Sequence, residues 1–138
     1  MGELILCKKE IAANPFYMDE LSVNLYSLEE MSYYIFHNVY LLGADFMSPE
    51  LCRWIDLELD MRELAEHLVV MISENAPLHL FVERILSESG YLSPAEIKDT
   101  VEIILAFENK SDAERKKIRA DRLADKKRLL EAVYEYEN

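Results

Sequence analysis

Apolar residues recur along most of this chain at the three- and four-residue spacing that places them on one face of an α-helix. The clearest stripe covers residues 61–72, where apolar side chains stand at i, i+3, i+4, i+7, i+8 and i+11. Similar stripes cover residues 28–42, 51–59, 78–86 and 97–105. Since each stripe needs another element to cover it, the pattern predicts several helices packed around one core.

Helix start signals precede three of these stripes. Ser27 with Glu30, and Ser93 with Glu96, have the spacing of capping boxes, in which each side chain accepts a hydrogen bond from the other residue's backbone N–H. Ser48 stands before a proline at the first helical position, which also predicts an N-cap.

Stop signals divide the stripes into short helices. Gly43 and Gly90 are expected to end helices, because glycine readily adopts the left-handed conformation found there. Asp60 is expected to cap the helix over 61–72, and residues 109–112 are expected to form a further break. The chain has only 3 glycines and 4 prolines in 138 residues, which favours helices joined by short loops over a sandwich or barrel.

Residues 1–26 differ from the rest. Asn14-Pro15 predicts a break, and the apolar residues that follow alternate with polar ones, as in short strand segments. We therefore expect an irregular N-terminal arm packed on the helices. The alternating apolar positions are Phe16, Met18, Leu21, Val23 and Leu25.

Together these signals predict an all-α fold, an array of about six to seven short antiparallel helices with a short irregular N-terminal arm. Residues 1–110 are expected to form an acidic helical domain. Residues 111–138 are expected to form a charged, repeat-like helical hairpin, with a helix over about 113–126 and a last helix that begins near Leu129. This hairpin either packs on the same core or belongs to a truncated domain.

The charge is distributed unevenly between these two parts. Residues 1–107 hold 6 Lys and Arg against 19 Asp and Glu, whereas residues 108–138 hold 9 against 8. An acidic body of this kind repels phosphate backbones, which argues against nucleic-acid binding by residues 1–107. The basic residues over 115–128 leave one alternative, an RNA-binding regulator that uses this helix, although Asp121 and Asp125 interrupt the run.

The histidines and cysteines give no catalytic or metal-binding pattern. None of His37, His67 and His79 follows a Glu at the Glu-x-x-His spacing, and no His-Glu-x-x-His occurs. Cys7 and Cys52 are far apart and match no zinc spacing, so reduced cytoplasmic thiols are expected, with Cys52 packed as a small hydrophobe. No metal or cofactor is predicted. An enzyme whose site combines scattered carboxylates with His67 remains the main alternative.

No targeting or membrane segment is evident. The N-terminal apolar run is only four residues long and is followed by charged residues, so it is not a signal peptide. No apolar stretch approaches 18 residues, so no membrane partner is expected.

Aromatic residues gather in the first third of the chain, and core packing explains most of them. The chain has 8 tyrosines, however, and each buried hydroxyl needs a hydrogen-bond partner, so several should reach the surface. Tyrosine beside acidic residues is typical of protein interfaces. We expect Tyr33, Tyr34 and Tyr40 to contribute to partner binding.

Small and large apolar residues are spaced along the C-terminal segment as in a helical hairpin. They are Ala120, Leu123, Leu129, Glu131-Ala132-Val133 and Tyr136. This spacing resembles half of a tetratricopeptide repeat, a helical hairpin module that stacks and binds other proteins. Two features depart from that family: Lys127 stands where a turn glycine is usual, and Lys116 and Arg119 stand where a tryptophan and a leucine are usual. The remainder of the chain resembles helical proteins of Gram-positive anaerobic bacteria that have no function attached.

The resemblance implies a non-catalytic interaction or adaptor domain in the bacterial cytoplasm. One half-repeat leaves an apolar face uncovered, which implies either further repeats or self-association through the last helix. The open side of that helix is expected to bind the partner through Leu130, Val133 and Tyr134. The pathway and the identity of the partner are not encoded in any motif of the chain.

Overall fold

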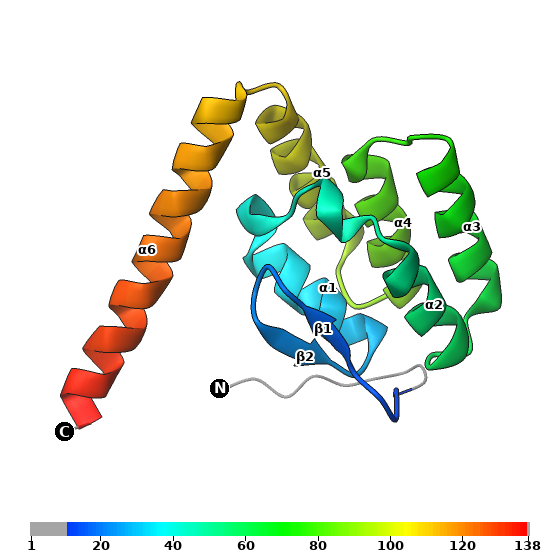
Figure 1. Cartoon of the computed structure of the whole chain (residues 1–138), viewed down its shortest axis with the longest axis horizontal. Helices are drawn as coiled ribbons and strands as arrows, with labels where there is room; N and C mark the ends of the chain where they lie inside the picture. Colours follow the sequence, from blue (N-terminus) through cyan, green and yellow to red (C-terminus); the bar gives the residue numbers. More distant parts are fainter. Residues whose placement is uncertain (1–10, 138) are drawn as a thin grey trace.

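The computed structural model describes residues 11–137, and for residues 112, 126 and 128–137 it describes the backbone alone. The described residues form two short strands, two 3₁₀ turns and six α-helices, so the predicted all-α class is confirmed (Figure 1). In chain order the elements are β1 (Phe16–Met18), β2 (Val23–Leu25), α1 (Leu28–His37), η1 (Val39–Leu41), η2 (Ala44–Phe46), α2 (Pro49–Leu57), α3 (Arg62–Ser73), α4 (Leu78–Ser89), α5 (Pro94–Glu108) and α6 (Asp112–Glu137).

The N-terminal arm folds into a small antiparallel hairpin of β1 and β2, in which Tyr17 pairs with Asn24. Both of these side chains are exposed, whereas Met18 and Leu25 are fully buried against the helices. The predicted alternation over this segment is confirmed. Residues 1–10, including Cys7, lie outside the described residues.

The arm is fastened to α2 through Asn14. Its backbone N–H and side-chain amide donate to the two carboxylate oxygens of Glu58, at 3.0 and 3.2 Å. The indole Nε1 of Trp54 donates to the carbonyl oxygen of Asn14 at 2.8 Å. These two donors from Asn14 stabilise the charged carboxylate and lower the pKa of Glu58.

The hydrogen bonds from Asn14 to the Glu58 carboxylate predict that docking of the arm depends on pH. Because the pKa of Glu58 is lowered on folding, its ionised carboxylate stabilises the docked arm at pH values above the usual glutamate pKa of about 4.3. This stabilisation is lost as the pH falls through the lower pKa of the folded state. Trp54 is the only tryptophan of the chain, so its emission should shift to longer wavelength over this acid range. In Glu58→Gln the acid-induced shift of Trp54 emission should disappear. An identical acid transition in both proteins would show that Glu58 does not control arm docking.

The three predicted serine caps are confirmed. The Oγ atoms of Ser27, Ser48 and Ser93 accept hydrogen bonds from backbone N–H groups three residues later, at 3.1, 3.3 and 3.2 Å. Ser93 and Glu96 form the predicted capping box. At the start of α1 the Glu30 carboxylate instead accepts from the backbone N–H of Tyr26, at 2.9 Å. Gly90 follows α4 with φ +67°, the left-handed conformation expected of a helix-ending glycine.

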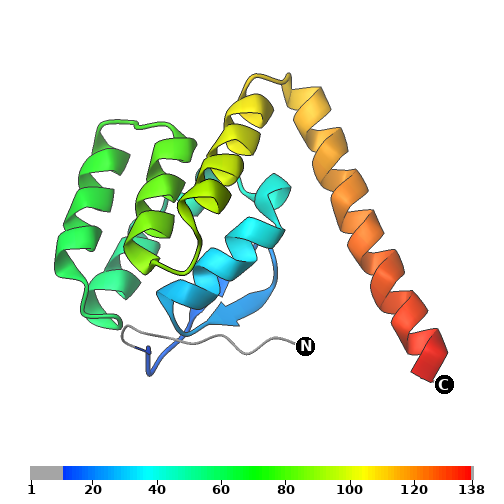
Figure 2. The same ribbon diagram turned by 180° about the vertical axis from the view of Figure 1, so that it is seen from behind.

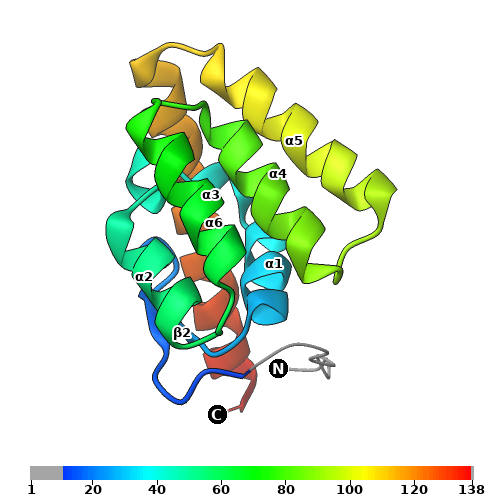
Figure 3. The same cartoon turned by 90° about the vertical axis from the view of Figure 1, so that its right-hand side faces the viewer.

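The core lies between the hairpin, α1 and the helices that follow. α2 packs mainly on α3, α4 packs mainly on α5, and α1 lies against α4 and β2 (Figures 1 and 3). The stripes predicted from the sequence supply the fully buried side chains of this core. They include Leu28, Met31, Ile35, Leu51, Ile55, Leu68, Phe81, Ile85 and Leu86.

Two predicted helix boundaries are wrong. The first helix was expected to continue to Gly43, but α1 ends at His37, where the Asn38 side chain donates to the Tyr34 carbonyl oxygen at 2.9 Å. The apolar stripe continues beyond this point as η1. Asp60 does not cap α3: it has φ +54°, and α3 begins after Met61 without a side-chain cap.

The predicted C-terminal hairpin is also wrong. α6 is one continuous helix of 26 residues, and the turn expected at Lys127 does not form (Figure 2). Residues 125–128 read Asp-Lys-Lys-Arg, with neither glycine nor proline, and lysine and arginine are strong helix formers. The small and large residues that resemble a repeat therefore lie along a single helix.

Candidate functional site

The helix α6 meets the body at a junction formed by Arg119. Its Nη2 donates to the Leu42 carbonyl oxygen at 3.2 Å, and its guanidinium carbon lies 5.2 Å from the ring centroid of Phe107. Gly43 leaves room for this approach, because a Cβ there would lie only 3.1 Å from the same Nη2 and the guanidinium would have to shift slightly. The guanidinium thus fixes α6 against the loop after η1 and against the end of α5.

A second arginine extends the junction by one helical turn. The guanidinium carbon of Arg122 lies 4.4 Å from the ring centroid of Tyr40, which itself stands edge-on to Phe107 at 5.8 Å. Cation–π contacts of this kind contribute about 0.5–1 kcal/mol each at exposed positions. Two basic side chains of α6 are therefore used for binding to the aromatic residues of its own body.

A cavity of about 190 Å³ lies beside this junction, between the loop after η1, α5 and the start of α6. Its walls combine apolar side chains with Glu108, Arg115 and Arg119. Next to it, His79 Nδ1 lies 3.6 Å from Glu108 Oε2. Sites for drug-sized ligands have volumes of about 300–1,000 Å³, so this cavity is below that range.

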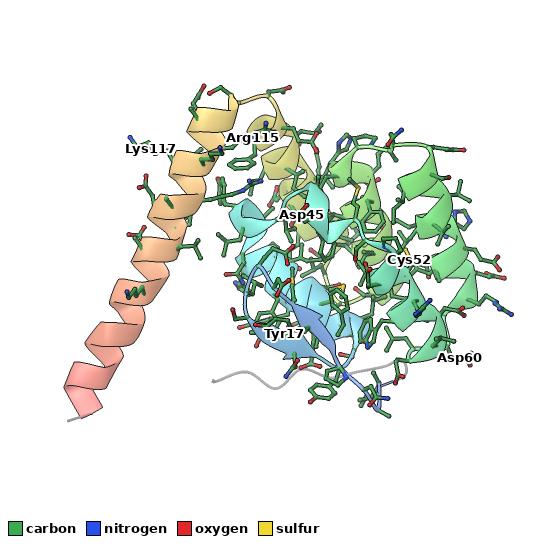
Figure 4. The ribbon with its side chains drawn as sticks, viewed as in Figure 1. Tyr17, Asp45, Cys52, Asp60, Arg115 and Lys117 are labelled. Carbon is green, nitrogen blue, oxygen red and sulfur yellow. The ribbon has the colours of Figure 1, made fainter. Side chains whose placement is uncertain are left out.

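Exposed side chains of α6 flank this junction. Lys116, Leu123 and Lys127 lie along one side of the helix, next to Arg119, at intervals of seven and four residues, and the Leu123 side chain is 50% exposed. Lys117 is exposed as well and points away from the body, whereas Arg115 points toward it (Figure 4). The exposed surface of α6 is thus basic, with Leu123 as an apolar residue beside the lysines.

The three predicted tyrosines are less exposed than expected. Tyr33, Tyr34 and Tyr40 are half-buried and contact other aromatic rings of the body. Tyr33 lies 4.5 Å from the His37 ring, by centroids. Two other tyrosines are more accessible, Tyr17 on β1 at 52% and Tyr26 at 40%.

The three predicted C-terminal residues lie in the second half of α6. Leu130, Val133 and Tyr134 belong to the helix, and their side chains lie outside the described residues. The ribbon of α6 diverges from the body toward this end (Figures 1 and 2). Their role in partner binding stays a prediction.

Sequence reasoning missed an apolar surface on α2 and α3. Leu57 is 69% exposed, and Val69 and Val70 are 50% exposed each. The apolar stripe over 61–72 predicts that Val69 faces the core, and this prediction is wrong. The signal was present, because residues 68–72 are apolar without interruption and a single helix face cannot hold five consecutive side chains.

The groups considered for catalysis are dispersed. His67 is exposed on α3, and no three His, Cys, Asp or Glu side chains gather into a metal site within the described residues. Cys52 is buried on α2, as predicted for a small hydrophobe, and burial raises the pKa of its thiol. The Cys52 thiol is therefore kept in its protonated, unreactive form near neutral pH.

Comparison with known proteins gives no assignment. No family model, curated protein or solved structure matches the chain. Among the described residues, no helix has the length and apolar character needed to cross a membrane.

Proposed function

We propose that this protein is a non-catalytic interaction or adaptor domain of the bacterial cytoplasm, with α6 as its docking element. The observation that carries this proposal is the length of α6 relative to its support. At 1.5 Å per residue the helix is about 39 Å long, yet the element that it contacts most is the three-residue η1. A long helix held at one end presents the rest of its surface to a partner, which is either a second copy or another protein.

The exposed composition of α6 supports the same proposal. Leu123 is half exposed beside lysines, and an exposed apolar side chain of this kind can anchor a helix in a partner groove. By contrast, Arg119 and Arg122 are directed to the aromatic rings of the body, which reduces the positive charge available to a phosphate backbone. An RNA-binding role for residues 115–128 is therefore the weaker proposal.

The test is the double variant Val133→Ser/Tyr134→Ser. We expect it to retain the helical content and melting temperature of the parent, because the two positions lie near the end of α6, and to weaken association by at least tenfold. Affinity purification from cell extract, followed by size-exclusion chromatography with light scattering, measures both kinds of partner. Unchanged association in the double variant would contradict the role of the second half of α6.

The enzyme alternative, a site of scattered carboxylates with His67, predicts a different result. A metal enzyme of this type should carry a stoichiometric metal through purification, and His67→Ala should release it. Elemental analysis of both proteins distinguishes this alternative from an interaction domain.

A further inference from the structure

A groove of about 610 Å³ runs between α2 and α3. Its exposed apolar side chains are Leu57, Val69 and Val70. Its charged lining residues are Arg53, Asp56 and Glu66. Large exposed aliphatic side chains gathered in one groove are typical of a surface that another element covers. Two helices with an apolar channel between them can bind a third helix that presents an apolar side chain to the channel.

The charges around the groove indicate what kind of helix fits it. Residues 49–75, which span α2 and α3, carry 7 acidic and 2 basic residues, a net charge of −5. One of the basic residues, Arg62, already lies 3.7 Å from Asp56 and 3.9 Å from Glu66. The complementary partner is a basic helix with an apolar residue on its contact face.

The chain itself contains such a helix. Residues 113–128 of α6 carry 8 basic and 3 acidic residues. Arg119 and Arg122 contact the body, which leaves 6 basic residues against 3 acidic ones for a partner, a net charge of +3. Leu123 is the large apolar residue that this segment exposes among its described side chains, and the sign of its charge is opposite to that of residues 49–75. Electrostatic complementarity of this kind favours encounter and fixes orientation.

One molecule cannot form this contact with itself. α6 lies on one side of the body, and α2 and α3 lie on the opposite side (Figures 1 and 3). Arg119 and Arg122 also hold α6 on its own side, through Leu42, Phe107 and Tyr40.

We infer that the α2–α3 groove binds α6 of a second copy of this chain, through Leu123 and the lysines beside it. The inference rests on the proposed function, since it names the partner of α6. Because the two contacting surfaces differ, the interface is heterologous, and repetition of it produces a closed ring or an open chain of copies. Ionic contacts between the two surfaces should make the assembly weaker at high salt.

Two complementary variants test this arrangement. Leu57→Lys/Val69→Lys places positive charge in the groove and leaves α6 intact, whereas Lys116→Glu/Leu123→Glu reverses the character of α6 and leaves the groove intact. All four residues are exposed, so circular dichroism and melting temperature should match those of the parent. By sedimentation velocity, each variant alone should associate at least tenfold more weakly than the parent.

An equimolar mixture of the two variants should form a 1:1 dimer and nothing larger, because one intact groove then meets one intact α6. The matched control is Leu80→Lys/Leu105→Lys, which alters two apolar side chains, 43% and 39% exposed, outside both surfaces. It should assemble like the parent.

Two results would overturn the inference and can be told apart from a failure of the proposed function. If only the α6 variant loses self-association, α6 binds a surface other than the groove, and the proposed function stands. If the parent is monomeric at all concentrations, the partner of α6 is not a second copy. Retention of RNA by the parent, lost in the α6 variant, would instead identify a nucleic-acid partner.

Discussion

Replacement of Phe81 by alanine is expected to lower the free energy of unfolding by about 3–5 kcal/mol, the usual cost of removing a buried phenylalanine. Phe81 is fully buried on α4, and its ring stands edge-on to Phe46 at a centroid distance of 5.9 Å. The substitution removes the apolar contacts of the ring and leaves a cavity between α4 and η2. A loss of this size is a large share of the stability of a domain of this length.

Equilibrium unfolding in urea measures this difference. The matched control is Leu80→Ala, one residue earlier on the same helix, where the side chain is 43% exposed. Leucine and alanine have similar helix propensities, so the control should change the unfolding free energy by less than about 1.5 kcal/mol. Equal losses in the two variants would show that Phe81 is not a core residue.

The double variant Arg119→Ala/Arg122→Ala is expected to release α6 from the body. It removes one charge-assisted hydrogen bond to the Leu42 carbonyl and two cation–π contacts, to Phe107 and Tyr40. Together these contribute about 2.5–5 kcal/mol to docking of the helix. Because the contacts are local, the helices of the body should remain folded.

Hydrogen exchange measures this release at the receiving surface. Amides of residues 39–42 should exchange at least about tenfold faster in the double variant, because η1 loses its cover. Lys116→Ala/Lys117→Ala, which removes two exposed positive charges from the same helix, should leave that exchange unchanged. Unchanged exchange in the arginine variant would contradict the junction described for α6.

The parts of the fold that the sequence predicts best are those governed by local chemistry. The serines at 27, 48 and 93 cap helices because the interaction involves only the next three residues. Gly90 ends α4 for an equally local reason. The alternation over the arm also identified both strands, since pleated chain places successive residues on opposite faces.

Boundaries set by tertiary contacts were predicted less well. The apolar stripe over 28–42 continues past Asn38, so periodicity alone could not show that α1 ends there and a 3₁₀ turn follows. Asp60 is a good cap by residue type, but the chain reverses between α2 and α3 and places it in the left-handed conformation. The C-terminal hairpin was inferred from the spacing of small residues, a weaker signal than the strong helix formers at residues 126–128.

The surfaces were the least predictable part. Tyr40 and Tyr33 were expected at the surface because tyrosine is common at interfaces, yet they pack against Phe107 and His37. Val69 was expected in the core because it fits the apolar stripe of α3, yet its side chain is 50% exposed. Both errors have one cause: the sequence gives the faces of a helix but not which neighbour covers each face.

Amine-reactive crosslinking of the isotope-labelled protein in cell extract, followed by mass spectrometry, shows whether α6 is the docking element. Lys116, Lys117 and Lys127 on α6, and Lys98 and Lys110 elsewhere, are all exposed, so the reagent reaches both sets. If α6 docks to a partner, the three lysines of α6 should form intermolecular links. Intermolecular links confined to Lys98 and Lys110 would contradict it.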